Sequence, residues 1–196
     1  AAYQLRRKGH ACTIFEANDA LGGMFKFGIP GYRVPRDKLD SEIQRIIDMG
    51  VEVKLKTKVG TDVAVEDLER DYDAVLWGIG CQSGRGLPVP GWEGTPNCVS
   101  GVAFLKAFNE GRMKVTADKV VCIGGGDTSI DVVSVARRIG HIQHTKPSDL
   151  PETIIHDGYV AHDTAVTAAA QGAAVTLTSL FPRAKMMAAA HEVHDA

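Results

Sequence analysis

The sequence has 196 residues, with 22 Lys plus Arg against 24 Asp plus Glu, and 44% of its residues are hydrophobic. This is the composition of an ordinary globular protein, long enough to bury a core without a disulfide or a structural metal. Because basic residues are not in excess, the composition argues against a nucleic-acid-binding protein. No apolar run approaches the roughly 20 residues that span a bilayer. The first residues lack the order of a signal peptide, so we expect a cytoplasmic protein without a membrane span.

The beginning of the chain matches the second half of a nucleotide-binding βαβ unit. A helical pattern over residues 1–10 is followed by a short apolar strand over 11–16 that ends in Glu16. In dinucleotide-binding folds an acidic residue at this place binds a ribose, about 20 residues after a glycine-rich turn. That turn would precede Ala1, so we expect the first strand and its phosphate loop to be missing from this chain. A strand that ends in a solvated glutamate is the alternative interpretation.

Apolar periodicity predicts three helices and two strands in the middle of the chain. The predicted helices cover residues 35–49, 63–69 and 99–109, and the predicted strands cover residues 51–55 and 73–77. Gly50 stands where a glycine commonly follows the end of a helix. We expect the strand at 73–77 to be buried and to run into Gly78-Ile79-Gly80. The stretch 84–96, rich in proline and glycine, is predicted to be a connector.

A second nucleotide-binding unit is predicted from a strand at 119–123, a glycine turn at Gly124-Gly125-Gly126 and a helix after it. Without Cβ atoms the backbone of such a turn can approach a pyrophosphate, whose charge is met by the positive end of the helix. Asp127 and Thr128 stand at the helix start, where Asp127 is expected to cap the helix, to line a cofactor site, or both. Ser129 occupies the place of the third glycine of the G-x-G-x-x-G pattern.

This second unit is interrupted before its next strand. The helix is expected to close at Gly140, whereas the next strand pattern, at 174–178, comes more than thirty residues later. We predict an inserted loop from 141 to about 159 and an added alanine-rich helix at 161–171. The predicted fold class is α/β with two Rossmann-like dinucleotide-binding domains, each a parallel sheet with flanking helices, of which the first is incomplete.

Several chemistries are excluded by missing motifs. The four cysteines contain no C-x-x-C pair, which argues against a zinc ribbon and a thioredoxin-type redox pair. We expect Cys12 and Cys122 to lie in the core, and only Cys81 invites a test of reactivity. His191 and His194 lack a partner motif that would complete a metal site, so no metal is predicted. The absence of a G-x-S-x-G elbow and of a P-loop ending excludes hydrolase and NTPase functions.

One long segment carries a family resemblance. Residues 21–35, Leu-Gly-Gly-Met-Phe-Lys-Phe-Gly-Ile-Pro-Gly-Tyr-Arg-Val-Pro, resemble the L-G-G-x-L-x-x-G-I-P-x-x-R-L-P segment of the flavoproteins related to the small subunit of glutamate synthase. The flavin domain of dihydropyrimidine dehydrogenase is in the same group. Further family motifs are matched in the expected order at residues 73–81, 87–91 and 124–131. The resemblance covers residues 1–140 and resumes at about Gly172.

The resemblance implies an oxidoreductase with a partial FAD-binding domain at 1–113 and an NAD(P)-binding domain at 114–196 that carries an insert at about 141–172. Hydride would pass from NAD(P)H to FAD, and electrons would leave for iron–sulfur centres of a partner domain or subunit. No side chain is expected to act as a catalytic acid or base. The implied FAD-binding residues are Glu16, Gly22, Gly23, Arg33, Val59, Gly78 and Gly80. The residues expected to bind NAD(P)H are Gly124, Gly125, Gly126, Asp127, Thr128 and Arg183.

The sequence departs from the family at two places. Members that use NADPH bind its 2′-phosphate with an Arg-Arg pair. The corresponding residues here are Leu180 and Phe181, with only Arg183 nearby, so the choice between NADH and NADPH stays open. The family's second flavin segment, a Gly-Asp pair, has no counterpart before Ala196. We therefore expect this chain alone to hold FAD poorly and to show little turnover, the activity belonging to a longer parent.

Two other functions remain as alternatives. The first is a disulfide reductase of the same architecture, against which the missing C-x-x-C motif counts. The second is a sensor or regulatory module in which one nucleotide site acts without flavin reduction. The sequence does not name the final electron acceptor, because glutamate synthesis is one role among several in this family. It also leaves open whether the chain forms a homo-oligomer.

Overall fold

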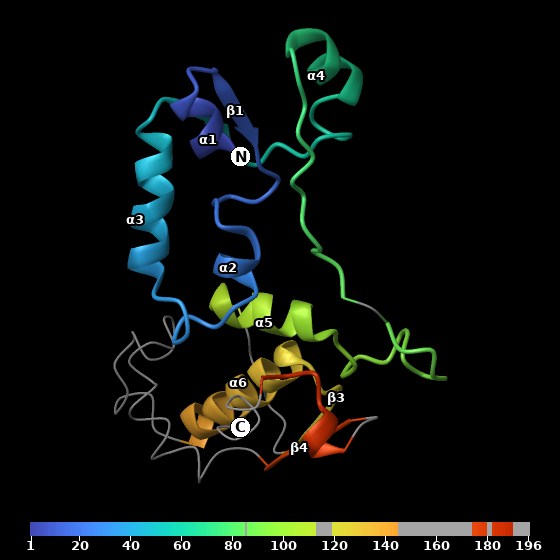
Figure 1. The fold of residues 1–196 in the computed structure, drawn as a ribbon. Helices are drawn as coiled ribbons and strands as arrows, with labels where there is room; N and C mark the ends of the chain where they lie inside the picture. Colours follow the sequence, from blue (N-terminus) through green and yellow to red (C-terminus); the bar gives the residue numbers. More distant parts are fainter. Residues whose placement is uncertain (85, 113–118, 145–173, 180–181, 190–196) are drawn as a thin grey trace. The chain divides into compact units, whose positions relative to one another are not determined.

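A computed structural model describes residues 1–84, 86–112, 119–144, 174–179 and 182–189 of the chain (Figure 1). The chain divides into two compact units. The first comprises residues 1–26 and 36–80, and the second comprises residues 27–35 and the described part of 81–196. The chain therefore passes between the units three times, after Lys26, Pro35 and Gly80.

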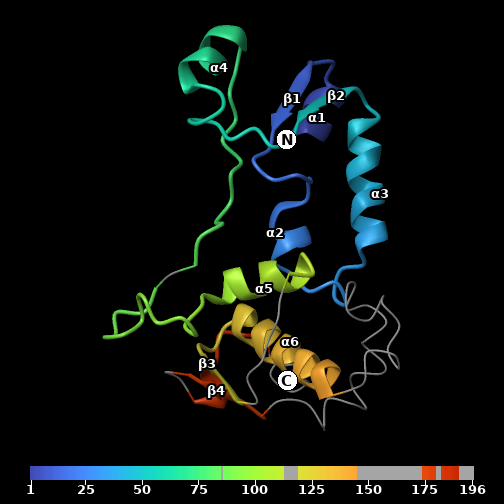
Figure 2. The ribbon, with the colours of Figure 1, turned by 180° about the vertical axis from the view of Figure 1, so that it is seen from behind.

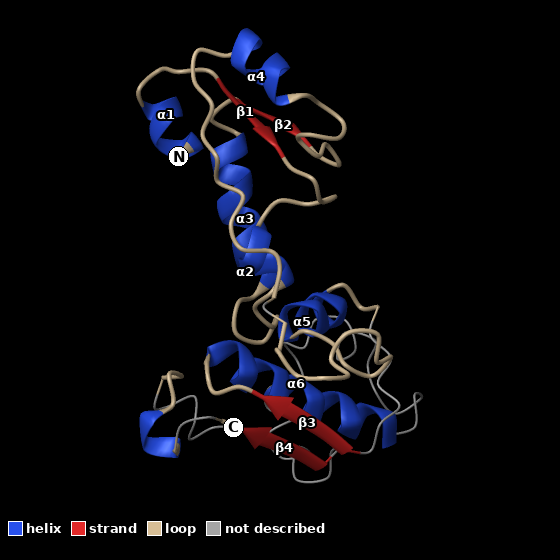
Figure 3. Cartoon of the chain, turned by 90° about the vertical axis from the view of Figure 1, so that its right-hand side faces the viewer, coloured by secondary structure: helices blue, strands red, loops and turns tan. Residues whose placement is uncertain are grey.

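The first unit alternates helices and strands. Its elements are α1 (Ala2–Arg7), β1 (Cys12–Phe15), α2 (Gly23–Phe27, whose last residue belongs to the second unit), α3 (Arg36–Ile47), β2 (Val51–Lys54) and α4 (Val65–Asp71). β1 and β2 lie side by side (Figure 3) and pair in parallel, with Cys12 opposite Val51 and Phe15 opposite Lys54. A parallel pair needs a long crossover, which α3 supplies here.

The helix predicted at 35–49 is confirmed as α3. Its apolar residues Leu39, Ile43, Ile46 and Ile47 are half-buried, which is expected for one stripe of a helix that lies at a surface. Gly50 takes a left-handed conformation, with φ +88°, and its N–H donates to the carbonyl of Ile47 at 2.8 Å. A residue with a Cβ is strained in this conformation, so glycine suits the end of the helix.

The buried strand predicted at 73–77 is wrong. Residues 73–80 form no strand, and Leu76, Trp77 and Ile79 are 71%, 54% and 74% exposed. A strand exists only when a neighbour accepts and donates its backbone hydrogen bonds. Among the described residues β1 pairs with β2 alone, and no other strand of this unit is available to pair with 73–77. The apolar side chains of this segment consequently stay exposed.

The second unit contains α5 (Gly101–Asn109), β3 (Lys119–Ile123), α6 (Asp127–His144), β4 (Ala174–Thr178) and the 3₁₀ helix η3 (Arg183–Lys185). β3 and β4 pair in parallel over their full length, from Lys119 opposite Ala174 to Ile123 opposite Thr178. Figures 1 and 2 show α6 beside α5 and beside this pair of strands. The strands predicted at 119–123 and 174–178 and the helix predicted at 99–109 are confirmed.

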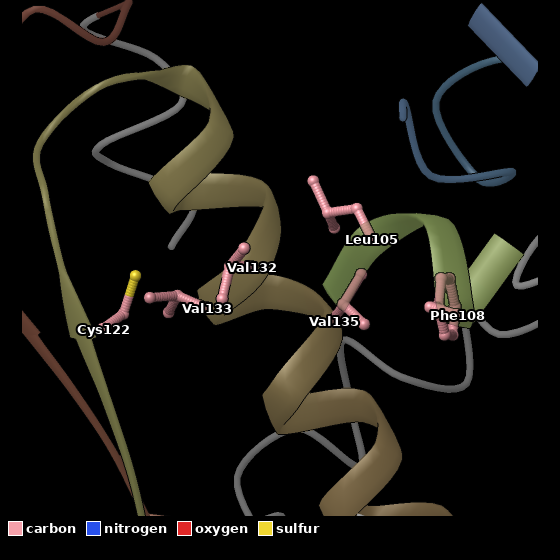
Figure 4. Close-up of a cluster of buried hydrophobic side chains, with 6 residues drawn as sticks. All are labelled: Leu105, Phe108, Cys122, Val132, Val133 and Val135. Carbon is pink, nitrogen blue, oxygen red and sulfur yellow. The ribbon is translucent and has the colours of Figure 1, made fainter. Parts of the chain in front are cut away.

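Most of the buried apolar side chains belong to the second unit. Its main cluster consists of Leu105, Phe108, Cys122, Val132, Val133 and Val135. In Figure 4, Val133 of α6 points toward Cys122 of β3, and Leu105 and Phe108 come from α5. Burying side chains of this size stabilises a fold by about 1.5–3 kcal/mol each. In the described part of the first unit only Val51 and Leu68 are buried to this degree.

The predicted end of the long helix at Gly140 is wrong, because α6 continues to His144. A glycine inside a helix costs only about 1 kcal/mol relative to alanine, so it does not by itself end one. The first four residues of the predicted insert are therefore helical. The rest of that insert and the helix predicted at 161–171 lie outside the described residues. No helix in the described ranges is long and apolar enough to cross a bilayer.

Candidate nucleotide-binding site

The glycine turn lies between the end of β3 and the start of α6. Gly124 has φ +148°, and a Cβ placed on it would collide with the hydroxyl of Ser129. A Cβ on Gly125 would lie 2.5 Å from the hydroxyl of Ser179. By contrast, a Cβ on Gly126 would meet no atom of the described residues within 4 Å. The first two glycines are thus required by the fold itself, whereas Gly126 borders open space.

The N-terminus of α6 is accessible beside this open space. Asp127 and Thr128 are exposed, whereas Ile130, in the first turn, is almost completely buried. The N–H groups of Ser129 and Ile130 already donate to the carbonyl of Gly126, at 2.9 and 3.2 Å. The start of a helix of 18 residues carries a partial positive charge that favours an anion. The geometry is compatible with a phosphate group held at Gly126.

Asp127 has a role that its place in the sequence does not predict. It is the first residue of α6, and its carboxylate accepts a 3.1 Å hydrogen bond from the N–H of Ala189 instead of capping the first turn. The neighbouring Ala188 is buried, and its N–H donates to the carbonyl of Gly125 at 3.1 Å. The segment after η3 is therefore fastened to the glycine turn. No local pattern in the sequence signals such a contact.

Two basic residues lie after β4, on the short helix η3. Arg183 is its first residue, and Lys185 is its last; both are exposed. Leu180 and Phe181, which replace the family's Arg-Arg pair, lie outside the described residues. Lys185 is not among the candidates from the sequence, although it stands only two positions after Arg183.

In the first unit, Glu16 directly follows β1. Its N–H donates to the carbonyl of Lys54 at 2.9 Å, which continues the β1–β2 ladder by one residue. Its carboxylate oxygen Oε1 accepts from the backbone and side-chain nitrogens of Asn18, at 2.8 and 2.7 Å. Glu16 is thus held at the carboxyl end of a parallel strand, the edge where such sheets bind ligands.

The other flavin candidates of the first unit lie in turns and in the segment 73–80, which forms neither a helix nor a strand. Gly22 has φ +122°, and a Cβ on it would lie 2.8 Å from Cβ of Lys26. Gly23, with φ +50°, begins α2. Val59 forms an isolated bridge with Val63. Gly78 and Gly80 are exposed, and Gly80 has φ +63°.

Arg33 belongs to the second unit, unlike the other flavin candidates. Its Nε lies 2.5 Å from Oδ1 of Asp131, the fifth residue of α6. Both atoms are buried, and the two side chains are only 27% and 13% exposed. In the sequence Asp131 is merely the last residue of a matched motif. The buried pair joins residues that are 98 positions apart, which no periodicity reveals.

The segment around Arg33 is anchored further by α5. The side-chain nitrogen of Asn109 donates to the carbonyl oxygens of Phe27 and Ile29, at 3.0 and 3.1 Å. Pro30 is almost completely buried, and Tyr32 packs against the apolar cluster of the second unit. Residues 27–35 are therefore a fixed part of this unit. Asn109 carries no signal in the sequence, since nothing around it resembles a motif.

The described cysteines differ in burial, and the described residues form no metal site. Cys122 is buried as expected, and burial raises the pKa of its thiol; its Sγ lies 3.7 Å from the carbonyl of Ser129, to which it donates. Cys12 is half-buried, and Cys81 and Cys98 are exposed. Within the ranges that the structure describes, no group of three His, Cys, Asp or Glu residues is placed to hold a metal ion. His191 and His194 lie outside those ranges.

Several curated proteins are similar in sequence, although no family model matches. The chain is 44% identical over 142 residues to the beta subunit of the NADP(+)-dependent formate dehydrogenase of Moorella thermoacetica, an alignment that covers 71% of this chain and 20% of that protein. It is 35% identical over 154 residues to the glutamate synthase [NADPH] small chain of Mycobacterium tuberculosis, covering 72% and 32%. It is 34% identical over 141 residues to the NAD-dependent dihydropyrimidine dehydrogenase subunit PreT of Salmonella typhimurium, covering 71% and 34%. The chain thus spans a fifth to a third of these relatives.

Solved structures share the fold. The complex of Mycobacterium tuberculosis FprA with NADPH superposes with a TM-score of 0.72 at 20% identity, over 99% of this chain and 43% of FprA. A 2-naphthoyl-CoA reductase complex gives a TM-score of 0.53 at 21% identity, over 91% of this chain and 26% of the reductase. At such identities the likeness shows the fold alone. It confirms a mixed α/β fold with parallel strands and leaves the two Rossmann-like domains as a prediction.

Proposed function

The chain belongs to the glutamate synthase small-chain family of NAD(P)H-dependent FAD oxidoreductases, and on this basis we propose that it is part of an enzyme that transfers hydride from NAD(P)H to FAD. The observation that carries the proposal is the glycine turn between β3 and α6, which leaves Gly126 open at the start of a long helix. Such a turn, followed by a helix and a parallel strand, is the minimal unit that binds a dinucleotide pyrophosphate.

The second unit fits the nicotinamide cofactor. Gly126 offers a place where the backbone can approach a phosphate, and the exposed start of α6 supplies the positive end of the helix. In this proposal Gly124 and Gly125 shape the turn, and Asp127 holds the segment that closes it. Residues 114–196 are then the NAD(P)-binding domain, built as a Rossmann-like unit.

The first unit fits FAD less completely. Glu16 after the end of β1 and the Gly22-Gly23 pair at the start of α2 match the places that the family uses for the ribose and the flavin loop. The described residues of this unit contain no G-x-G-x-x-G turn between a strand and a helix that would bind the flavin pyrophosphate. We propose that residues 1–113 contribute part of an FAD-binding domain that the longer protein completes. FAD, when bound, accepts the hydride and releases electrons one at a time.

The choice between NADH and NADPH depends on the residues after β4. Relatives are named for NADP, for NADPH and for NAD. Leu180 and Phe181 stand where the family has the two arginines that bind a 2′-phosphate. The exposed Arg183 and Lys185 follow in the sequence, so two cations are present shortly after these positions. If NADPH is preferred, Arg183→Ala is expected to lower kcat/KM for NADPH more than for NADH.

The electron acceptor is proposed to be an iron–sulfur domain or subunit. The relatives are named as subunits or chains of formate dehydrogenase, glutamate synthase, an Fe(3+) oxidoreductase and dihydropyrimidine dehydrogenase. These names differ in the substrate, so the flavin module does not by itself determine the acceptor. A cytoplasmic location and a homo-oligomer remain predictions.

The test is anaerobic reduction of the complete protein that carries this chain. Its flavin absorbance is recorded before and after addition of NADH to one sample and NADPH to another. We expect one cofactor to bleach the flavin, and electrons then to reach an added iron–sulfur partner. Binding of cofactor without bleaching would instead support the sensor function, and reduction of a dithiol substrate would support the disulfide reductase.

A further inference from the structure

The buried Arg33–Asp131 ion pair lies one helical turn from the start of α6. Asp131 follows Asp127, the first residue of the helix, by four positions. Residues four apart lie on the same face of a helix, separated by about 6 Å along its axis. The Asp131 carboxylate is therefore close to the place where the proposed function puts a cofactor pyrophosphate.

A carboxylate at this place would work against phosphate binding. The helix start attracts an anion by its partial positive charge, and a nearby negative charge opposes that attraction. Asp131 is only 13% exposed, so water and salt screen its charge less than they would at the surface. The site consequently needs an opposite charge beside Asp131.

Arg33 supplies that charge from a fixed position. Its Nε lies 2.5 Å from Oδ1 of Asp131, and both atoms are buried. The backbone around it is held by the two hydrogen bonds from Asn109 and by the buried Pro30. The guanidinium therefore stays beside Asp131 whether or not a ligand is bound, because moving it would disrupt this packing.

We propose that Arg33 is a positioning residue of the nicotinamide cofactor site, where its guanidinium neutralises Asp131 beneath the first turn of α6 and so permits the pyrophosphate to bind. This inference rests on the proposed function. It gives Arg33 a role within the second unit, beyond the flavin role that the family resemblance implies.

The experiment measures the affinity of the complete protein for NADP⁺ and NAD⁺ by titration calorimetry. Arg33→Met, which removes the guanidinium that contacts the Asp131 carboxylate, is expected to weaken binding about tenfold, equal to about 1.4 kcal/mol. Arg33→Lys keeps the charge and is expected to bind almost as the unaltered protein does. The double variant Arg33→Met/Asp131→Asn, without either charge, is expected to recover most of the affinity.

Two further readouts separate an electrostatic role from a structural one. The melting temperature of Arg33→Met should stay above the assay temperature, and its FAD content should equal that of the unaltered protein, so that neither unfolding nor loss of FAD accounts for the change in affinity. If Arg33→Met does not fold, Arg33→Gln replaces it, since the amide keeps hydrogen-bond donors without the charge.

Each outcome decides between the proposals. Unchanged affinity in Arg33→Met, or a double variant that binds as weakly as Arg33→Met, would overturn the inference while leaving the proposed function intact. An unaltered protein that binds neither nucleotide would overturn both.

Discussion

The carboxylate of Asp127 accepts a 3.1 Å hydrogen bond from the backbone N–H of Ala189, which lies 62 positions further along the chain. Beside it, the N–H of Ala188 donates to the carbonyl of Gly125. The chain after β4 is thus joined to both the glycine turn and the start of α6. The shape of the turn depends on this segment as well as on its own glycines.

Replacing Asp127 should loosen that segment. We expect Asp127→Ala to lower the free energy of unfolding by about 1 kcal/mol, because one hydrogen bond and one favourable charge at a helix start are lost. Asp127→Asn keeps an acceptor oxygen and should lose less than half as much. Amide hydrogen exchange at Ala189 checks the cause. Equal protection of this amide in all three proteins would contradict the role given to Asp127.

Gly124 and Gly126 should respond differently to the same substitution. Gly124→Ala is expected to destabilise the fold by about 1–3 kcal/mol, because its φ of +148° strains a residue with a Cβ and the methyl group collides with Ser129. In the part of the chain that the structure describes, the methyl group of Gly126→Ala meets no atom within 4 Å, so stability should be unchanged. Its methyl group would occupy the space proposed for a phosphate, so KM for NAD(P)H should rise at least about tenfold. Denaturant unfolding and steady-state kinetics measure the two effects. A normal KM in Gly126→Ala would argue against a phosphate at this position.

Asn109 should be important for stability although it belongs to no motif. Asn109→Ala removes the hydrogen bonds to the carbonyls of Phe27 and Ile29, and at about 1 kcal/mol for each bond we expect a loss of about 2 kcal/mol. Asn97, an exposed asparagine after the connector, provides the matched control. Asn97→Ala should change stability by no more than about 0.5 kcal/mol. If both variants unfold at the same denaturant concentration, the anchoring of residues 27–35 by α5 is not significant.

The raised pKa of Cys122 predicts a stability that falls in alkaline solution. Below the ordinary thiol pKa of about 8.5 both the folded and the unfolded protein carry the proton, so the contribution is fully present. As the pH rises further, the unfolded thiol ionises first, because burial raises the pKa of the folded one. Stability is therefore lost between these two pKa values.

Denaturant unfolding at pH 7 and pH 10 measures this effect. The difference between the two pH values should be smaller in Cys122→Ala than in the unaltered protein, and Cys12→Ala should leave it unchanged. The exposed Cys81 and Cys98 should react with a thiol reagent in the folded protein, whereas Cys122 should react only after unfolding. Rapid modification of Cys122 in the native state would show that β3 and α6 do not seal it.

Local patterns predict most of the elements correctly. The helix α3, the parallel strands β3 and β4 and the helix start after the glycine turn follow from apolar spacing and glycine placement, which depend on neighbours in the chain. The strand expected at 73–77 depends on a pairing partner, and an apolar run cannot indicate whether one is present. Gly140 suggests a helix end because glycine is a poor helix former, yet its cost is small compared with the gain from a continuing helix.

The candidate site is predictable in part for the same reason. The turn Gly124–Gly126 carries its own signal, since few folds apart from nucleotide-binding ones need three glycines between a strand and a helix. The contact of Asp127 with Ala189 and that of Arg33 with Asp131 join distant segments, and only the three-dimensional structure reveals them. A motif thus indicates the candidate site, but the residues that support the glycine turn are visible only in the fold.

The placement of residues 27–35 affects how this protein can be divided for experiments. The second unit is discontinuous in sequence, so a fragment that begins at Cys81 would lack Phe27, Pro30 and Arg33, which are packed into it. Expression of that fragment alone should give a protein with newly exposed apolar surface. Joining residues 27–35 to its N-terminus by a flexible linker, or adding them as a synthetic peptide, should restore cooperative unfolding. Cutting the chain at a single position would therefore separate residues 27–35 from the rest of the second unit.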